Sequence, residues 1–146
     1  MPMTVRRVVT GHDEAGKSVV IIDDIAQNGA SRRRGHDSRV VWVTDGDTPP
    51  NQGNDDAGAR TVGRPPPPGG AIFRVMELQP DQDLEMHKTE TIDYVVVIEG
   101  ELNLVLDESE IALRPGDCLV QRGTNHAWRN TGDGPCRLAA ILIDAG

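Results

Sequence analysis

The second half of the chain is a series of short strand patterns separated by turns, and this series constrains the fold more than any other feature. Leu102, Leu104 and Leu106 alternate with polar residues, which is the period of a strand that buries one face. Pro115-Gly116 ends another such segment in a turn. No segment shows the period of an amphipathic helix of useful length. Short strands with regular turns are typical of a sandwich or closed barrel, so we expect an all-β domain.

The expected strands extend over most of the chain. In the second half they fall within residues 71–79, 91–98, 101–107, 111–117, 118–121, 126–130 and 136–144. In the first half, residues 5–10 and 18–23 flank a turn and predict a hairpin, and residues 39–44 predict a further strand. Residues 45–70 are rich in Pro, Gly, Asn and Asp, which predicts a long loop.

The length of 146 residues indicates a single domain. Within it, we expect residues 1–70 to form N-terminal strands and a loop that pack on a barrel formed by residues 71–146.

Charge and composition exclude several classes of partner. The net charge is −8, and the only basic cluster is the arginine run of residues 31–35, which we interpret as a solvated loop. An acidic chain without a basic stripe predicts no binding to nucleic acid or to an anionic membrane. The N-terminus has no apolar signal region, and no run reaches membrane-spanning length, so we expect a cytoplasmic protein. Cys118 and Cys136 lie in apolar strand patterns and are expected to be buried thiols without a disulfide.

Two stretches carry residues suited to chemistry. The first, "MHKTETIDYVVVIEGE" (residues 86–101), places His87 and Asp93 before or within a β-branched strand, and the second, "QRGTNHAWRN" (residues 121–130), contributes His126. Strands far apart in sequence lie side by side in a barrel, so these residues can face one lumen. Two imidazoles and one carboxylate suit a divalent transition metal and leave coordination positions open.

At these residues the chain resembles the small single-domain cupins, which fold as a double-stranded β-helix of the jelly-roll type. The first cupin motif is matched by His87, Thr89, Asp93 and Gly100. The second is matched by Pro115–Asp117, Gly123, His126 and Asn130. The resemblance covers residues 71–144. The amino-acid sequences of both stretches are also similar to those of one subgroup of uncharacterised bacterial and fungal cupins. It implies a cupin barrel with an N-terminal strand extension.

The chain departs from the cupin pattern at three positions. Thr89 stands where the family has a second histidine, and a hydroxyl is a poor ligand for zinc or ferrous iron. Asp93 stands where the family has the longer glutamate, and Gln121 replaces a proline and brings an amide near the lumen. The resemblance then implies a metal (Fe, Mn, Ni or Zn) held by His87, Asp93 and His126.

Each of these residues also has a simpler interpretation. His87 is a surface histidine if its polar neighbours set its environment, and Asp93 faces solvent if its strand is an edge strand. His126 is a satisfied core histidine if it bonds a backbone carbonyl. The pocket would then be polar and free of metal. His12 and His36 lie in turn-like segments, and we interpret both as solvated.

Three further residues are candidates for contact with a substrate. Arg74 alternates with apolar residues and points either into the barrel, where it would steady an anion together with Gln121, or away from it. Trp128 should share a face with His126 and lines a pocket or fills the core. Thr89 would lie in the substrate pocket.

The expected function is that of a metal-dependent enzyme acting on a small organic molecule, with lyase or isomerase chemistry such as decarboxylation, dehydration or enolisation. A ferrous dioxygenase is the second enzyme hypothesis, and a non-catalytic small-molecule-binding cupin is the third. The apolar N-terminal strands need a partner surface, so we expect a homodimer.

Overall fold

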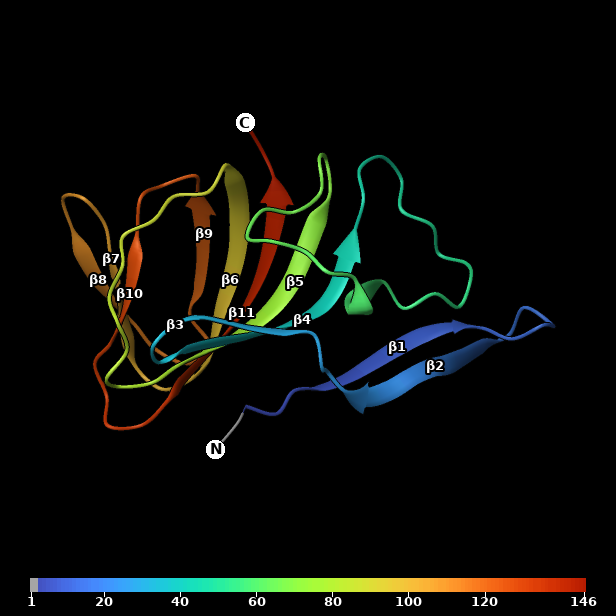
Figure 1. The fold of residues 1–146 in the computed structure, drawn as a ribbon, viewed down its shortest axis with the longest axis horizontal. Coiled ribbons are helices and arrows are strands. Elements are labelled where there is room, and N and C mark those ends of the chain that lie inside the picture. The colour runs from blue at the N-terminus through green and yellow to red at the C-terminus, as the bar shows by residue number, and fades with distance from the viewer. Residues whose placement is uncertain (1–2) are drawn as a thin grey trace.

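The computed structural model describes residues 3–146, which form an almost wholly antiparallel β-structure (Figure 1). The strands of the first half are β1 (Arg6–His12), β2 (Ser18–Ile25), β3 (Gly29–Arg33) and β4 (His36–Thr44). The strands of the second half are β5 (Ala71–Leu78), β6 (Thr91–Glu99), β7 (Leu102–Val105), β8 (Glu110–Leu113), β9 (Cys118–Arg122), β10 (Ala127–Asn130) and β11 (Cys136–Asp144). The predicted all-β fold is confirmed.

Two sheets form the two walls of a jelly roll. The larger sheet has the strand order β3-β4-β5-β11-β6-β9, and the smaller has the order β10-β7-β8. Figure 1 shows the smaller sheet beside the β9–β6–β11 part of the larger one. Leu102 and Leu104 of the smaller sheet belong to the same buried cluster as Val95 and Leu138 of the larger sheet. The core therefore lies between the two sheets, as in double-sheet jelly rolls.

Strand β6 alternates as the sequence predicts. Asp93 and Val95 are buried, whereas Tyr94 between them is 51% exposed. The turn after β6 depends on Gly100, whose φ is +82°, and a Cβ there would lie 2.8 Å from the sulfur of Cys136. Only glycine adopts this conformation without strain at such a close approach. This turn and the alternation together fix which face of β6 looks into the barrel.

The N-terminal strands take two different places. β1 and β2 form the predicted hairpin, which pairs with no other strand of residues 3–146 and extends away from the barrel in Figure 1. β3 and β4 instead join the larger sheet, where β4 pairs with β5. Between β4 and β5 lies the predicted long loop, which contains one short 3-10 helix, η1 (Ala57–Ala59).

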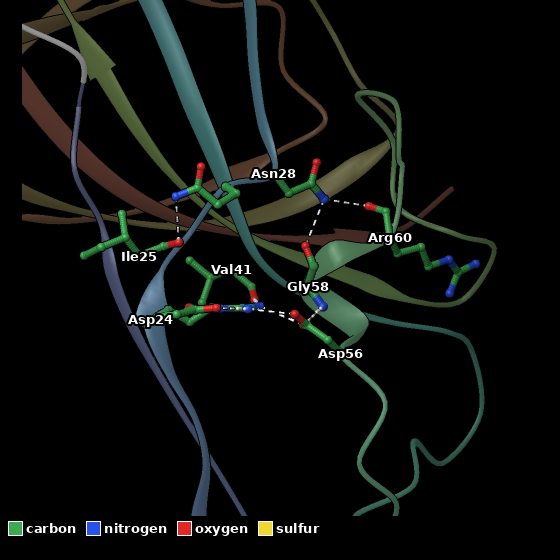
Figure 2. A network of polar contacts seen from close by, with 9 residues as sticks. Asp24, Ile25, Asn28, Val41, Asp56, Gly58 and Arg60 are labelled. Carbon is green, nitrogen blue, oxygen red and sulfur yellow. Dashed lines mark hydrogen bonds and ion pairs between the residues drawn. The ribbon is translucent and has the colours of Figure 1, made fainter.

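Arg7 ties the hairpin to this loop. Its guanidinium, 5% exposed, donates to both carboxylate oxygens of Asp24 in β2 and of Asp56 before η1, at 2.7–3.0 Å. Figure 2 shows the carboxylates of Asp24 and Asp56 at the two ends of this network, and the Asn28 amide bonded to Gly58 and Arg60 nearby. Charge-assisted hydrogen bonds therefore hold the hairpin to the loop.

Three expectations about the first half and the cysteines are wrong. The arginine run (residues 31–35) is not a solvated loop. Its first three residues are the last three of β3, a strand that the sequence pattern does not predict, and Arg33 is half-buried. His36 is likewise half-buried at the start of β4. Cys118 is exposed, because it lies on the outer face of β9, whereas Cys136 is buried as expected; neither forms a disulfide.

Residues 3–146 contain no helix long and apolar enough to cross a bilayer.

Replacing Arg7 tests the network around it. We expect Arg7→Met to lower the free energy of unfolding by about 1–2 kcal/mol, less than for a fully buried pair because both carboxylates are partly solvated. Urea denaturation measures the change.

Arg6→Met is the matched control. Arg6 lies on the same strand and pairs with Asp23, but both side chains are exposed, so no measurable loss is expected.

Arg7 lowers the pKa of Asp24 and of Asp56 below the ordinary value of 3.8. The stability from these carboxylates is therefore present above that pH and is lost as pH falls through the lowered values. Equal losses in both variants, or a difference that grows in acid, would contradict this account.

Candidate functional site

His87 and His126 face each other across an isolated pair of backbone hydrogen bonds. The amide of His87 donates to the carbonyl of His126 at 2.8 Å, and the amide of His126 donates back at 2.9 Å. Residues that are directly opposite in an antiparallel pair point to the same side. The two imidazoles accordingly lie together, with ring centroids 4.3 Å apart and planes tilted by 55°.

Each imidazole is also oriented by a backbone carbonyl. Nδ1 of His87 lies 3.2 Å from the carbonyl of Glu85, and Nδ1 of His126 lies 2.8 Å from that of Thr124. A carbonyl only accepts, so in each ring Nδ1 carries the proton and Nε2 is the acceptor, and in His126 this Nε2 accepts from the Gln121 amide. Burial lowers the pKa of both histidines, which favours this neutral form. Both rings are therefore oriented as a metal-ligating histidine usually is.

The carboxylate of Asp93 is held between Thr91 and Gln121. The Thr91 hydroxyl donates to Oδ1 at 2.7 Å, and the Gln121 amide nitrogen lies 3.5 Å from Oδ2. The same nitrogen lies 3.0 Å from Nε2 of His126. The amide oxygen of Gln121 is buried and has no hydrogen-bond partner among residues 3–146. Gln121 thus connects the predicted carboxylate to one predicted histidine.

These residues line a cavity of about 80 Å³, several times the space that one water needs. All seven residues singled out from the sequence contribute to its wall: Arg74, His87, Thr89, Asp93, Gln121, His126 and Trp128. Arg74 faces inward and is 5% exposed, which decides between its two predicted orientations. Trp128 fills the core and also lines the cavity, with its ring edge-on to His126 at 5.7 Å between centroids.

Sequence reasoning missed four basic residues in the wall, namely Arg32, Arg33, His36 and Arg64. Burial, then the charge of Arg33, lowers the pKa of His36 to about 4, and burial with the charge of Arg32 lowers the pKa of Arg74 to about 10. No local pattern marks these residues. Arg32 and Arg33 come from β3, and Arg64 comes from the long loop, so only the tertiary fold brings them to the cavity.

The donor chemistry of the wall fits a divalent transition metal, but the side chains as they lie do not converge on one point. Among residues 3–146, no three His, Cys, Asp or Glu side chains are close enough together to hold an ion. The Gln121 amide lies between Asp93 and His126, so coordination by both requires this amide to move. The side-chain oxygen of Gln121, which has no hydrogen-bond partner among residues 3–146, is a further atom of a type that coordinates metals.

Comparison with known proteins shows the family. The cupin domain matches residues 74–143. Phomopsin biosynthesis cluster protein D of Diaporthe leptostromiformis is 40% identical over 135 residues, which are 87% of this chain and 71% of that protein. A cupin-domain-containing oxidoreductase of Aspergillus ruber is 36% identical over 150 residues, covering 94% of this chain and 71% of that protein. The chain belongs to the cupin family, as its motifs predict.

Solved structures agree on the fold. A polyketide cyclase from Streptomyces resistomycificus superposes with a TM-score of 0.57 at 16% identity, over 81% of this chain and 73% of that one. A cupin-superfamily sugar phosphate isomerase from Silicibacter pomeroyi gives a TM-score of 0.51 at 23% identity, over 76% and 60% of the two chains. At such identities the likeness establishes the cupin jelly roll and nothing about the reaction.

Thr91→Val tests the hydrogen bond that orients Asp93. The substitution keeps the shape of the side chain, which is 2% exposed, but removes the donor to a buried carboxylate. We expect the free energy of unfolding to fall by about 1–3 kcal/mol. Chemical denaturation measures this, with Thr10→Val on the exposed face of β1 as the control. If Thr91→Val is no less stable than Thr10→Val, Thr91 does not hold Asp93.

Proposed function

We propose that this cupin is a metal-dependent enzyme that acts on a small organic molecule. The observation that carries the proposal is the pair of imidazoles, His87 and His126, which present unprotonated Nε2 atoms beside the carboxylate of Asp93 in one cavity. A neutral imidazole has one donor and one acceptor nitrogen, and in both rings the donor is already used on a backbone carbonyl. Two such rings side by side, each fixed through Nδ1, are better explained as ligands.

His87, Asp93 and His126 would hold the metal (Fe, Mn, Ni or Zn). The ion, when bound, supplies Lewis-acid polarisation of a carbonyl or hydroxyl. Thr91 keeps the carboxylate of Asp93 turned toward the cavity. Thr89 stands at the cavity wall where the family has another histidine, and its hydroxyl is available to a substrate.

The rest of the wall supports lyase or isomerase chemistry. Such reactions build negative charge on an enolate or carboxylate oxygen, and that charge needs donors already in place. The guanidinium of Arg74 and the amide of Gln121 are buried donors in the same cavity as the imidazoles. Trp128 supplies a flat apolar surface for the carbon skeleton of the substrate. Decarboxylation, dehydration and enolisation all fit these groups.

A second candidate is an oxygen-dependent oxidoreductase. Relatives that match over most of this chain, from Aspergillus ruber and Hypocrea virens, carry the name cupin-domain-containing oxidoreductase. Two histidines and one carboxylate are also the ligand set of open ferrous sites, which leave room for oxygen. Oxygen consumption with ferrous protein and a substrate, measured with an oxygen electrode, separates this candidate from a lyase, which consumes none.

Metal content per chain tests the proposal. Protein purified without chelator or a histidine tag should contain one metal per chain by elemental analysis. His87→Ala and His126→Ala should each lower metal affinity by about tenfold or more, because each removes a direct ligand. His12→Ala is the control, because His12 is exposed on the hairpin far from these ligands in the fold.

Unchanged metal content in both site variants would contradict the metal-enzyme proposal. A protein that takes up no metal but binds a metabolite without converting it would instead be a small-molecule-binding cupin.

Nothing in the proposal requires nucleic acid or a membrane, and we propose a cytoplasmic protein.

We also propose that two copies of the chain form a homodimer through the hairpin. The hairpin exposes four apolar side chains (Val8, Val19, Val20 and Ile25), of which the neighbours Val19 and Val20 lie on opposite faces. The outer face of the larger sheet exposes a row of four more, adjacent across β5, β11, β6 and β9: Phe73, Ile141, Tyr94 and Val120. Monomers rarely leave two such surfaces in water, so the hairpin of one copy would cover the row of the other.

A charge on the hairpin should separate the copies. We expect Val20→Asp to convert a dimer into a monomer in sedimentation equilibrium, because it places a carboxylate within an apolar interface. Ile111→Asp is the matched control, since Ile111 is about as exposed but lies on β8 of the smaller sheet. A dimer that survives Val20→Asp, or a wild-type monomer, would contradict the proposal.

A further inference from the structure

The cavity wall carries far more positive than negative charge. Four guanidinium groups line it (Arg32, Arg33, Arg64 and Arg74) against one carboxylate, that of Asp93. The chain as a whole has a net charge of −8, so the positive wall is not a reflection of composition. A concave site of one sign focuses its field on a ligand of the opposite sign.

Most of this charge has no carboxylate partner within residues 3–146. Arg74 is 5% exposed, and among residues 3–146 the only hydrogen bond of its side chain is to the carbonyl of Gly63. Arg33 donates Nε to the carbonyl of Asp83, while its Nη2 is buried and has no hydrogen-bond partner among residues 3–146. Arg64 reaches a carboxylate only at 3.8 Å, to Glu85. A buried guanidinium without a counter-ion is costly, so its retention at a cavity calls for a ligand that supplies one.

Arg34, the neighbour of Arg33, shows the opposite arrangement. Its guanidinium is 61% exposed and pairs with Asp81 at 3.1 Å and Asp83 at 2.9 Å, outside the cavity. β3 ends at Arg33, and Arg34 lies in the following turn with Gly35, where φ is +74°. Arg32 and Arg33 line the cavity, and Arg34 is neutralised at the surface. The difference between them argues against a general basic surface.

Beside its arginines and the polar residues near Asp93, the wall has an apolar part. Met76, Val95, Trp128, Ala140 and Leu142 supply this part. A bare inorganic anion would leave these side chains without a partner. A molecule with a carboxylate at one end and a compact apolar body satisfies both parts of the wall.

We propose that the substrate of this site is a small organic acid, whose carboxylate is bound by Arg33 and Arg74 while its apolar body lies against Trp128. Arginine is suited to this role because its planar guanidinium matches a carboxylate with two parallel hydrogen bonds. Arg32 and Arg64 add charge around the same anion. The inference names the substrate class of the proposed enzyme site and rests on that proposal for the place of the chemistry.

Benzoate and benzamide are the probes, because they share size and shape but differ in charge. Isothermal titration of the purified full chain, in metal-loaded and in chelator-treated form, measures both. Benzoate should bind in both forms and benzamide about tenfold or more weakly than benzoate, because a charge-assisted pair is lost. Inorganic phosphate, the third probe, should bind more weakly than benzoate, because it cannot use the apolar wall.

Arg33→Met and Arg74→Met should each weaken benzoate binding by about tenfold or more, whereas Arg34→Met should leave it unchanged. Arg32→Met, at an exposed position, gives a smaller loss and serves as a variant whose folding is not at risk. Circular dichroism and metal content of each variant, expected to equal the wild type, separate a lost anion site from a lost fold or a lost metal.

Several outcomes would overturn the inference. These are equal effects in Arg34→Met and Arg33→Met, no saturable binding of benzoate up to about 10 mM, and phosphate binding more tightly than benzoate. Benzoate binding that vanishes with the metal but ignores the arginines would also overturn it, because the anion would then be a metal ligand. The proposed enzyme function would fail separately, through absent metal with benzoate still bound to the arginines.

Discussion

The pair of backbone hydrogen bonds between His87 and His126 is the constraint on which the site depends. It joins the segment before β6 to the segment before β10, and so brings together two parts of the chain that belong to different sheets. Because opposite residues of an antiparallel pair share a side, the bridge turns both imidazoles to the same side, and both line the cavity. The carbonyls of Glu85 and Thr124 then set the ring orientation. The geometry of the site thus comes from the backbone.

The barrel supplies a rigid wall on which this bridge rests. Alternation in β6 places Asp93 beside Val95 on the inner face, and β9 places Gln121 directly opposite Asp93. β5 contributes Arg74 in the same way. β3 and the long loop then add arginines at the wall that the jelly roll by itself lacks. The chemistry proposed for the site combines an imidazole–carboxylate centre from the barrel with a cationic wall that depends largely on the N-terminal half.

Strand alternation explains why much of the site is predictable from sequence. The inward orientation of Asp93 and the outward orientation of Tyr94 follow directly from the period of β6. The orientation of Arg74 does not, because both faces of β5 are apolar in sequence. Met3, Val5 and Ala26 cover the other face only around Val75, and Phe73 on that face stays exposed. These contacts come from the tertiary fold, so the sequence of β5 does not predict which way Arg74 points.

The arginine run shows what local patterns cannot give. It has the composition of a loop, yet Gly29–Arg33 becomes a strand because it pairs with β4 across the turn at Gly35. The turn is held by backbone hydrogen bonds from Gln79 to Gly35 and from Asp83 to Arg34. These long-range contacts decide which arginine lines the cavity and which faces water. For the same reason, the apolar pattern around Cys118 predicts a core position, whereas its strand exposes that face.

The protonation of the histidine rings tests the central claim most directly. Long-range ¹H–¹⁵N NMR correlations distinguish the two tautomers of each imidazole, and the chain has only four histidines. At neutral pH, His87 and His126 should carry the proton on Nδ1, and addition of Zn²⁺ should shift both Nε2 signals while His12 stays unchanged. A proton on Nε2 of either ring, or Nε2 signals that do not respond to Zn²⁺, would contradict the account of this pair as a metal centre.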